Sequence, residues 1–437
     1  MTPNPLPPPR LGPRPLPLHM AVEGWILQMS LAGLLPSSSA SSLSKPNPLA
    51  LLAANLPASL RAALQDLMAE AGLSPASPEP GSAAPLNPAS YIDAISREAT
   101  QRMETFARGV RAYQAHPYRR DLALPPAAWR MGAASLRDYG GPKNAPPVLF
   151  VPSLINRAYI LDLAQDRSLL RAAAKSGLRA YLLDWGDPGD AERRFTSGDY
   201  IEGVLIPALE EIKTRSGQVP RLVGYCLGGT LSVAPAVLRP DLVSALGLLA
   251  APWDFHSGTE ASRVLMDMSR PMIEVMLGAE GVASVDMLQA LFASLDPTLV
   301  GRKFRGFASL DPASDHARRF VELEDWLNDG VPLSGALAAE VFFTWYGSND
   351  PLQGQWKIGD RVIDPGLIGC PTLAFIPTQD RIVPPGSAQI LVDRIPTATA
   401  HKVDLGHIGM VAAANAPLAV YAPLLDWLQN PASKVRA

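Results

Sequence analysis

The chain has few cysteines, no excess of positive charge and no long apolar run, and each shortage argues against a class of protein. Only Cys226 and Cys370 occur in the sequence, outside any CxxC or Cys/His spacing. We therefore expect no disulfide framework, no metal site and a reducing, cytoplasmic setting. A net charge of −3 leaves no basic field to attract nucleic acid. The stretch closest to a membrane segment, residues 20–35, is short and contains Glu23, which favours a short amphipathic helix over a transmembrane segment or a secretory signal.

The remaining composition is that of a folded chain with an unusual beginning. Hydrophobic residues make up 47% of it and charged residues 18%, values typical of globular proteins. Residues 1–18 contain so many prolines that no helix or central strand is expected there. We expect a low-complexity, partly helical extension rich in Pro, Ala and Ser over residues 1–85. An α/β domain should follow over residues 86–432, entered through a helical stretch from Tyr91.

Short apolar runs alternate with helical patterns through most of this domain. Near-continuous apolar runs suit parallel strands covered by helices on both faces, so the alternation predicts a mostly parallel, doubly wound sheet. The strand rhythm stops over about 256–344, where helical patterns predict an inserted cap. The expected strands are residues 147–152, 179–185, 221–225, 245–252, 372–377 and 401–405.

Cys226 lies in the pentapeptide GYCLG, between one of these strands and a helical run. The pattern matches the nucleophile elbow G-x-S-x-G of α/β hydrolases, with cysteine in place of serine. Gly224 and Gly228 provide room where side chains would collide with the neighbouring strand and helix. The helix N-terminus favours a thiolate and a developing oxyanion. The pentapeptide alone leaves open that Cys226 is simply a small buried residue in a tight turn.

Two further residues complete a catalytic set in the chain order of such hydrolases, which is nucleophile, acid, histidine. Asp380 follows the expected strand 372–377, and His407 follows the strand 401–405. Both lie at carboxyl ends of strands, where open α/β sheets place their sites. An aspartate before a proline-containing turn can also simply cap a helix, here one starting at Val383. The three residues in order favour a triad in which His407 takes the Cys226 proton and Asp380 orients the imidazole.

Backbone N–H groups complete the expected site. The N–H of Leu227 is the first candidate to bind the oxyanion, and the turn after strand 147–152, around Ser153 or Leu154, is the expected source of a second donor. Trp185, Trp253, Trp326 and Trp345 are interpreted as packing aromatics. Asp254 and His256 stay ambiguous between a role at the cap hinge and support of the site.

The sequence resembles the polyhydroxyalkanoate (PHA, PHB) synthases of the α/β-hydrolase superfamily, most closely the class III catalytic subunit. The G-x-C-x-G-G box is met in full at residues 224–229. The resemblance spans about residues 145–425. It rests on VPSLINRAYILDL (151–163), DRSLLRAAAKSGLRAYLLDWGDPGD (166–190), TSGDYI (196–201), GYCLGG (224–229), WDF (253–255), ELEDWLNDG (322–330), DRIVPP (380–385) and LGHIGM (405–410).

This resemblance implies an acyltransferase that polymerises (R)-3-hydroxyacyl-CoA into polyester and releases CoA, with no cofactor besides the CoA thioester substrate. Carried over by position, Cys226 is the acylated nucleophile, His407 the base, and Asp380 the residue assisting the substrate's 3-hydroxyl. The resemblance also implies a growing polyester chain as partner, a second synthase subunit, a homodimer or hetero-oligomer, and a cytoplasmic location at the polyester granule surface.

Two other functions stay open from the sequence. An intracellular polyester depolymerase or acyl-CoA thioesterase can use the same triad with water as acceptor. A non-catalytic granule-associated protein is the second alternative, against which the intact triad speaks. The sequence departs from the family in its long N-terminal extension, in the cap segment 256–320 and at Pro235, which should kink or end the helix after the elbow.

Overall fold

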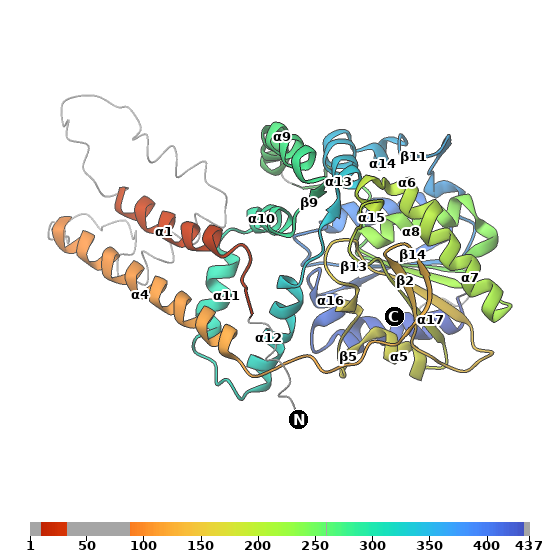
Figure 1. Ribbon diagram of the computed structural model, residues 1–437, viewed down its shortest axis with the longest axis horizontal. Helices are drawn as coiled ribbons and strands as arrows, with labels where there is room; N and C mark the ends of the chain where they lie inside the picture. Colours follow the sequence, from red (N-terminus) through yellow and green to blue (C-terminus); the bar gives the residue numbers. More distant parts are fainter. Residues whose placement is uncertain (1–9, 33–87, 259, 432–437) are drawn as a thin grey trace, which may run out of the picture. The chain divides into compact units, whose positions relative to one another are not determined.

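The structure is a computed structural model that describes residues 10–32, 88–258 and 260–431. It divides into two compact units (Figure 1). The described residues within 120–288 and 329–437 form an α/β unit, and those within 1–119 and 289–328 form a helical unit. The expected limits, 1–85 and 86–432, differ from this division. Residues 88–119 and 289–328 pack with residues 10–32 rather than with the sheet.

The α/β unit contains an eight-stranded sheet in the order β1-β2-β6-β3-β7-β8-β13-β14. The strands from β6 to β14 pair in parallel, and β1 and β2 add an antiparallel hairpin next to β6. This is the mostly parallel α/β-hydrolase sheet that the alternation predicts. Its strands are β1 (Ala127–Met131), β2 (Ala134–Asp138), β3 (Pro147–Val151), β6 (Arg179–Asp184), β7 (Arg221–Tyr225), β8 (Leu246–Leu249), β13 (Thr372–Pro377) and β14 (Ala398–Val403).

All six expected strands occur, and the sequence reading missed only the hairpin of this sheet. The central strands β3, β7, β8 and β13 are buried almost throughout, because helices cover both faces of a parallel sheet. The edge strand β14 is mostly exposed and begins three residues before the expected segment 401–405. An exposed edge strand does not need a continuous apolar run, so its start carries no apolar signal.

Helices connect these strands and form the cap between β8 and β13 (Figure 1). Helix α8 passes through Pro235 and ends at Leu238, within one turn of that proline, as the missing N–H predicts. The α-helices that lie wholly in the α/β unit are α5 (Leu169–Lys175), α6 (Ser197–Tyr200), α7 (Ile206–Ser216), α8 (Leu227–Leu238), α9 (Glu260–Glu280), α13 (Gly335–Glu340), α14 (Asp350–Gln353), α15 (Pro385–Arg394), α16 (Gly409–Ala412) and α17 (Ala422–Gln429). Its π-helices are η3 (Ile201–Leu205), η5 (Val341–Ser348) and η7 (Pro417–Tyr421), and short 3-10 helices occur between them.

The helical unit packs α1 (Leu16–Ala32), α4 (Pro88–Ala115), α11 (Leu299–Phe307) and α12 (Asp315–Asn328) around an aromatic core. Helix α10 (Val285–Leu295) begins in the α/β unit and ends in this one. Phe106 and Tyr113 of α4 contact Phe304 edge to face, and Phe307 stacks on Phe320. Such ring pairs stabilise the packing beyond the area that they bury.

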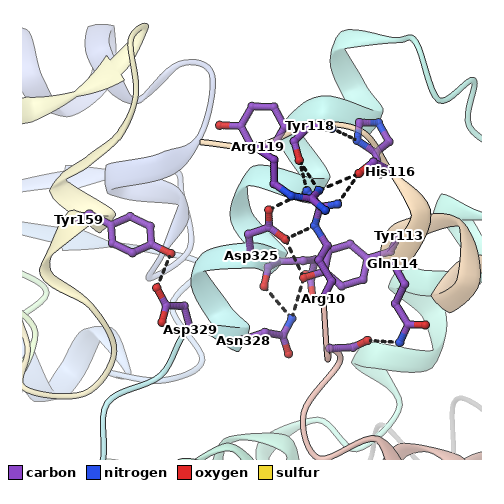
Figure 2. Close-up of polar contacts among 12 residues, drawn as sticks. Arg10, Tyr113, Gln114, His116, Tyr118, Arg119, Tyr159, Asp325, Asn328 and Asp329 are labelled. Atoms are coloured by element: carbon purple, nitrogen blue, oxygen red, sulfur yellow. Dashed lines mark hydrogen bonds and ion pairs between the residues drawn. The ribbon is translucent and has the colours of Figure 1, made fainter. Parts of the chain in front are cut away.

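Arg10 joins the beginning of the chain to this helical unit (Figure 2). Its Nε donates to Asp325 Oδ1 at 2.6 Å, and its other nitrogens donate to the carbonyls of His116 and Tyr118. Tyr113 donates its hydroxyl to the same Asp325 oxygen at 2.9 Å. The Arg10 side chain is 6% exposed, so the carboxylate and carbonyls replace the water that the guanidinium loses.

Helix α1 begins at Leu16, inside the segment where proline was expected to prevent any helix, so that prediction is wrong. Pro17 stands in the first turn, where a backbone N–H would have no partner within the helix, so the N–H that proline lacks costs nothing there. Glu23 is buried and pairs with Arg305 of α11 at 2.6 Å. The second expected helical segment, around residues 50–72, lies outside the described residues. No helix in the described ranges is long and apolar enough to cross a membrane.

Candidate active site

The sharp turn between β7 and α8 holds Cys226 in a strained backbone conformation. Its φ of 55° and ψ of −130° lie outside the regions that non-glycine residues prefer. A Cβ on Gly224 would lie 2.5 Å from the carbonyl oxygen of Gly228, and one on Gly228 would lie 2.3 Å from that of Pro152. Both glycines are therefore required by close backbone contacts, as the elbow pattern predicts.

The same contacts bring the end of β3 next to the start of α8. Leu227 is the first residue of α8, so its N–H has no carbonyl to pair with inside the helix. Gly228 lies against the carbonyls of Val151 and Pro152, directly before Ser153 and Leu154, which are both buried. The structure thus places the turn of the expected second oxyanion donor beside the elbow.

His407 and Asp380 form a buried pair at the ends of β14 and β13. The His407 Nδ1 donates to Asp380 Oδ2 at 2.6 Å, with exposed side-chain fractions of 7% and 0%. The other Asp380 oxygen, Oδ1, accepts the N–H groups of Ile382 and Val383, each at 2.8 Å. Asp380 therefore organises the turn and orients the imidazole, while α15 begins only at Pro385. Oδ1 therefore makes the kind of backbone contacts that the helix-capping alternative expects, whereas Oδ2 binds His407, which that alternative does not explain.

The electrostatics of the site depend on Cys226. Burial by itself lowers the pKa of His407. The negative charge on Cys226, hydrogen bonds to Asp380 and Cys226, and the Asp380 charge outweigh burial and raise this pKa to about 10. Below that pH the imidazole is protonated and donates to Asp380 through Nδ1. The arrangement suits a thiolate nucleophile whose histidine can return a proton to a leaving group.

Tyr225 supports the pair from the last position of β7, a contact that the sequence reading missed although the residue is part of the elbow motif. Its hydroxyl donates to the His407 carbonyl at 3.2 Å, and its ring centroid lies 5.3 Å from the imidazole. Burial, followed by the charges of Cys226 and Asp380, raises the pKa of Tyr225 well above its usual value. The phenol therefore stays neutral and fixes the loop that carries His407.

The second cysteine lies apart from this chemistry. Burial raises the pKa of the Cys370 thiol to about 11, which makes it inert at neutral pH. No group of three or more His, Cys, Asp or Glu side chains in the described part of the chain could hold a metal ion.

Comparison with known proteins identifies the class first. Residues 146–412, more than half of the chain, match the family of the alpha/beta hydrolase fold. The chain belongs to that family, in agreement with its sheet and elbow.

Curated relatives narrow the class. The poly(3-hydroxyalkanoate) polymerase subunit PhaC of Synechocystis sp. is 32% identical over 65% of this chain and 78% of its own length. The proteins of the same name from Allochromatium vinosum and Haloferax mediterranei are each 29% identical. These matches cover 67% and 64% of this chain, and 84% and 58% of the two relatives. The chain belongs to the poly(3-hydroxyalkanoate) polymerase family, and it spans little more than half the length of the Haloferax relative.

Proposed function

We propose that this protein is a polyhydroxyalkanoate synthase that polymerises (R)-3-hydroxyacyl-CoA and releases CoA through a thioester on Cys226. The observation that carries the proposal is a cysteine in a strained elbow, together with a buried His407–Asp380 pair whose pKa responds to the charge on that cysteine, in a chain of the polymerase family. A cysteinyl thioester keeps an acyl group activated for attack by a hydroxyl, because exchange between two thioesters is nearly thermoneutral.

The first step transfers the acyl group. The Cys226 thiolate attacks the thioester carbonyl, and the N–H of Leu227, with a donor from the turn of Ser153 and Leu154, binds the oxyanion. The bond between the carbonyl carbon and the CoA sulfur breaks, and the proton on His407 goes to the departing thiolate. Free CoA and an acylated Cys226 result.

The second step extends the polymer. The 3-hydroxyl of another hydroxyacyl group loses its proton to the now neutral His407, and its oxygen attacks the thioester on Cys226. An ester bond forms, the carbon–sulfur bond breaks, and the nucleophile is regenerated. The resemblance implied that Asp380 itself assists the 3-hydroxyl. The burial of this carboxylate, with both oxygens already bonded, instead supports a role exerted through His407.

The proposal also covers the partners of the protein and its location in the cell. The relatives are named as subunits of a polymerase, and we include a second synthase subunit and a homodimer or hetero-oligomer on that basis. We also propose that the enzyme acts at the surface of a cytoplasmic polyester granule, since its product is a water-insoluble chain.

The proposal is tested with purified protein and (R)-3-hydroxybutyryl-CoA, by following free thiol, turbidity and product mass. We expect insoluble polyester to accumulate together with CoA. Free 3-hydroxybutyrate without polymer would identify a thioesterase instead. If no thiol is released, with or without a second subunit, both functions are contradicted.

Cys226→Ala is the sharpest variant for this assay. Without the sulfur no acyl-enzyme forms, so CoA release should fall by about 10⁴-fold or more. Thermal melting provides the control for folding, because alanine meets the same backbone strain as cysteine. Activity that survives in a folded variant would remove Cys226 from the mechanism.

A further inference from the structure

Trp185 follows β6 at its carboxyl end, and its indole makes a contact that the mechanism above does not use. The Nε1–H donates to the carbonyl oxygen of Pro152 at 3.0 Å, and both residues are buried. Strands β3 and β6 are parallel neighbours in the sheet, so their carboxyl ends meet at the edge where the site lies. The sequence indicates only a packing aromatic at this position, whereas the structure adds a hydrogen bond to the turn after β3.

The carbonyl that Trp185 holds also lies against the nucleophile elbow. A Cβ on Gly228 would lie 2.3 Å from the Pro152 oxygen and 2.4 Å from that of Val151, so the Pro152 oxygen is directed toward the start of α8. Gly228 follows Cys226 by two residues. The turn after β3 therefore touches the elbow through the same group that the indole binds.

The direction of this carbonyl decides which N–H group of the turn can reach an oxyanion. The peptide bond between Pro152 and Ser153 is trans, so the Ser153 N–H points opposite to the carbonyl and away from the elbow. The N–H of Ile155 donates to Ser153 Oγ at 3.2 Å, which engages it within the turn. Leu154 lies between these two residues and is 5% exposed. Its N–H is the one that both contacts leave for an oxyanion.

The indole itself has little freedom to move. Its ring meets that of Tyr200 edge to face, with centroids 5.6 Å apart, and Tyr200 meets Phe195 in the same way at 5.3 Å. A capping box between Thr196 and Asp199 fixes the backbone that carries Tyr200. Because buried rings in edge contacts have few alternative rotamers, the N–H of Trp185 has a defined position.

We propose that Trp185 is a positioning residue for the oxyanion hole. By holding the Pro152 carbonyl, it aims the N–H of Leu154 at the oxygen of an acyl group that Cys226 attacks. The inference rests on acyl transfer to Cys226, the first step of the proposed function, and adds a residue to it. Donors stabilise an oxyanion best when they are held in place before the charge develops. Loss of the indole bond therefore slows acyl transfer and leaves the thiolate unchanged.

The test compares two reactions of Cys226 in single turnovers. Acylation by (R)-3-hydroxybutyryl-CoA or by p-nitrophenyl acetate passes through a tetrahedral oxyanion, whereas alkylation by iodoacetamide displaces iodide at a saturated carbon and forms none. Trp185→Phe keeps an aromatic ring and loses the N–H. We expect it to slow acylation by both donors about tenfold or more, since an oxyanion donor is no longer aimed. The rate of alkylation should stay unchanged.

Trp356→Phe is the matched control. This buried indole of the same unit also donates one hydrogen bond at 3.0 Å, to Ser197 Oγ rather than to the turn after β3. Its removal should lower the melting temperature about as much as Trp185→Phe does, because each variant loses one buried hydrogen bond. Both reactions of Cys226 should keep their rates in the control. A loss of acylation confined to Trp185→Phe then reports positioning rather than stability.

Ser153→Ala tests the same turn with a smaller change. It frees the N–H of Ile155 from its acceptor, so we expect acylation to slow several-fold while alkylation keeps its rate. Ser216→Ala is the control for this variant, since Ser216 Oγ likewise accepts the N–H two residues further on, that of Gln218, at 3.2 Å. Ser216 ends α7, and its replacement should alter neither reaction.

The outcomes separate this inference from the proposed function. Equal losses of acylation and alkylation in Trp185→Phe would mean that the elbow itself has changed, and unchanged acylation would mean that the turn keeps its position without the indole. Either result overturns the inference. If wild-type protein is acylated by p-nitrophenyl acetate and not by the CoA thioester, the synthase proposal is contradicted, while the variants still decide the role of Trp185. Alkylation without acylation by either donor would contradict both.

Discussion

The two units of this chain bury charged groups for different purposes. In the α/β unit, Asp380 and His407 are 27 residues apart in sequence and pair at the ends of adjacent strands; in the mechanism that we propose, this pair serves the nucleophile. In the helical unit, Arg10 pairs with Asp325 across 315 residues of sequence, and Glu23 with Arg305 across 282. The same rule applies in both, because a buried charge needs a partner. The pair in the α/β unit is the one that the proposed mechanism uses, and the pairs in the helical unit hold distant segments of the chain together.

Removing the catalytic charge should have the largest effect. In Asp380→Asn the imidazole loses its charged partner, so we expect CoA release to slow by about 10²- to 10⁴-fold. Asp404→Asn is the matched control, because this exposed aspartate lies between β14 and His407 and accepts hydrogen bonds from the side chains of Thr378 and Gln379. Steady-state turnover distinguishes the two. Equal turnover in both variants would show that Asp380 only organises its turn.

Adding a side chain at a glycine of the elbow should have the next largest effect. The methyl group of Gly228→Ala would meet the carbonyl oxygens of Pro152 and Val151 at 2.3 and 2.4 Å. We expect it to lower the free energy of unfolding by about 3 kcal/mol. Gly203→Ala is the control, since nothing lies within 4 Å of the added carbon. Urea denaturation measures both, and a neutral Gly228→Ala would mean that the elbow can relax.

Breaking the ion pair between Arg10 and Asp325 should reduce stability by a smaller amount. Arg10→Ala removes the ion pair with Asp325 and the hydrogen bonds to two carbonyls. Tyr113 and Arg119 stay as donors to these groups, but Asp325 loses its charged partner, which we expect to destabilise the helical unit by about 2 kcal/mol. Arg97→Ala removes an exposed pair with Asp93 on α4 and should change stability by less than about 0.5 kcal/mol. Hydrogen exchange of α1 and α4 reports the effect. If both variants change the exchange rates by the same amount, the buried Arg10 pair stabilises the helical unit no more than an exposed pair does.

The smallest expected change is a shift in the pKa of His407. Its pKa is raised to about 10, so the ring stays protonated at neutral pH and loses its proton as the pH rises through that value. In Cys226→Ala the negative sulfur is gone and burial opposes only Asp380. The pKa should then fall by about one unit or more, equivalent to 1.4 kcal/mol. NMR titration measures it, and His401, whose pKa burial lowers, should titrate alike in both proteins. If the pKa of His407 is the same in both proteins, Asp380 and not Cys226 keeps the imidazole protonated.

The residues of the elbow and the triad could be predicted because their signals are local. Gly224, Cys226 and Gly228 form one pentapeptide, and Asp380 and His407 each follow an apolar strand. The hairpin of β1 and β2 was missed. These two strands lie at the antiparallel edge of the sheet, and β1 is only partly buried, so it needs no continuous apolar run.

The contacts between the cap helix η5 and the loop after β8 could not have been found from the sequence. Tyr346 lies in a helical stretch that follows no strand or motif. Its ring contacts Phe255 and its carbonyl oxygen lies 2.9 Å from His256 Nε2. These contacts join a helix to a loop, and the periodicity of neither segment encodes their approach.

The sequence by itself determined the fold class, the elbow and the order of the triad, since strand periodicity and the spacing of small residues are properties of short segments. Only the tertiary structure decided that both Asp380 oxygens are occupied, that the Tyr225 hydroxyl donates to the His407 carbonyl, and that residues 289–328 pack with the beginning of the chain. The reason is that burial and pairing of polar groups are set by segments far apart in sequence, and a local pattern contains no record of which partner will be met.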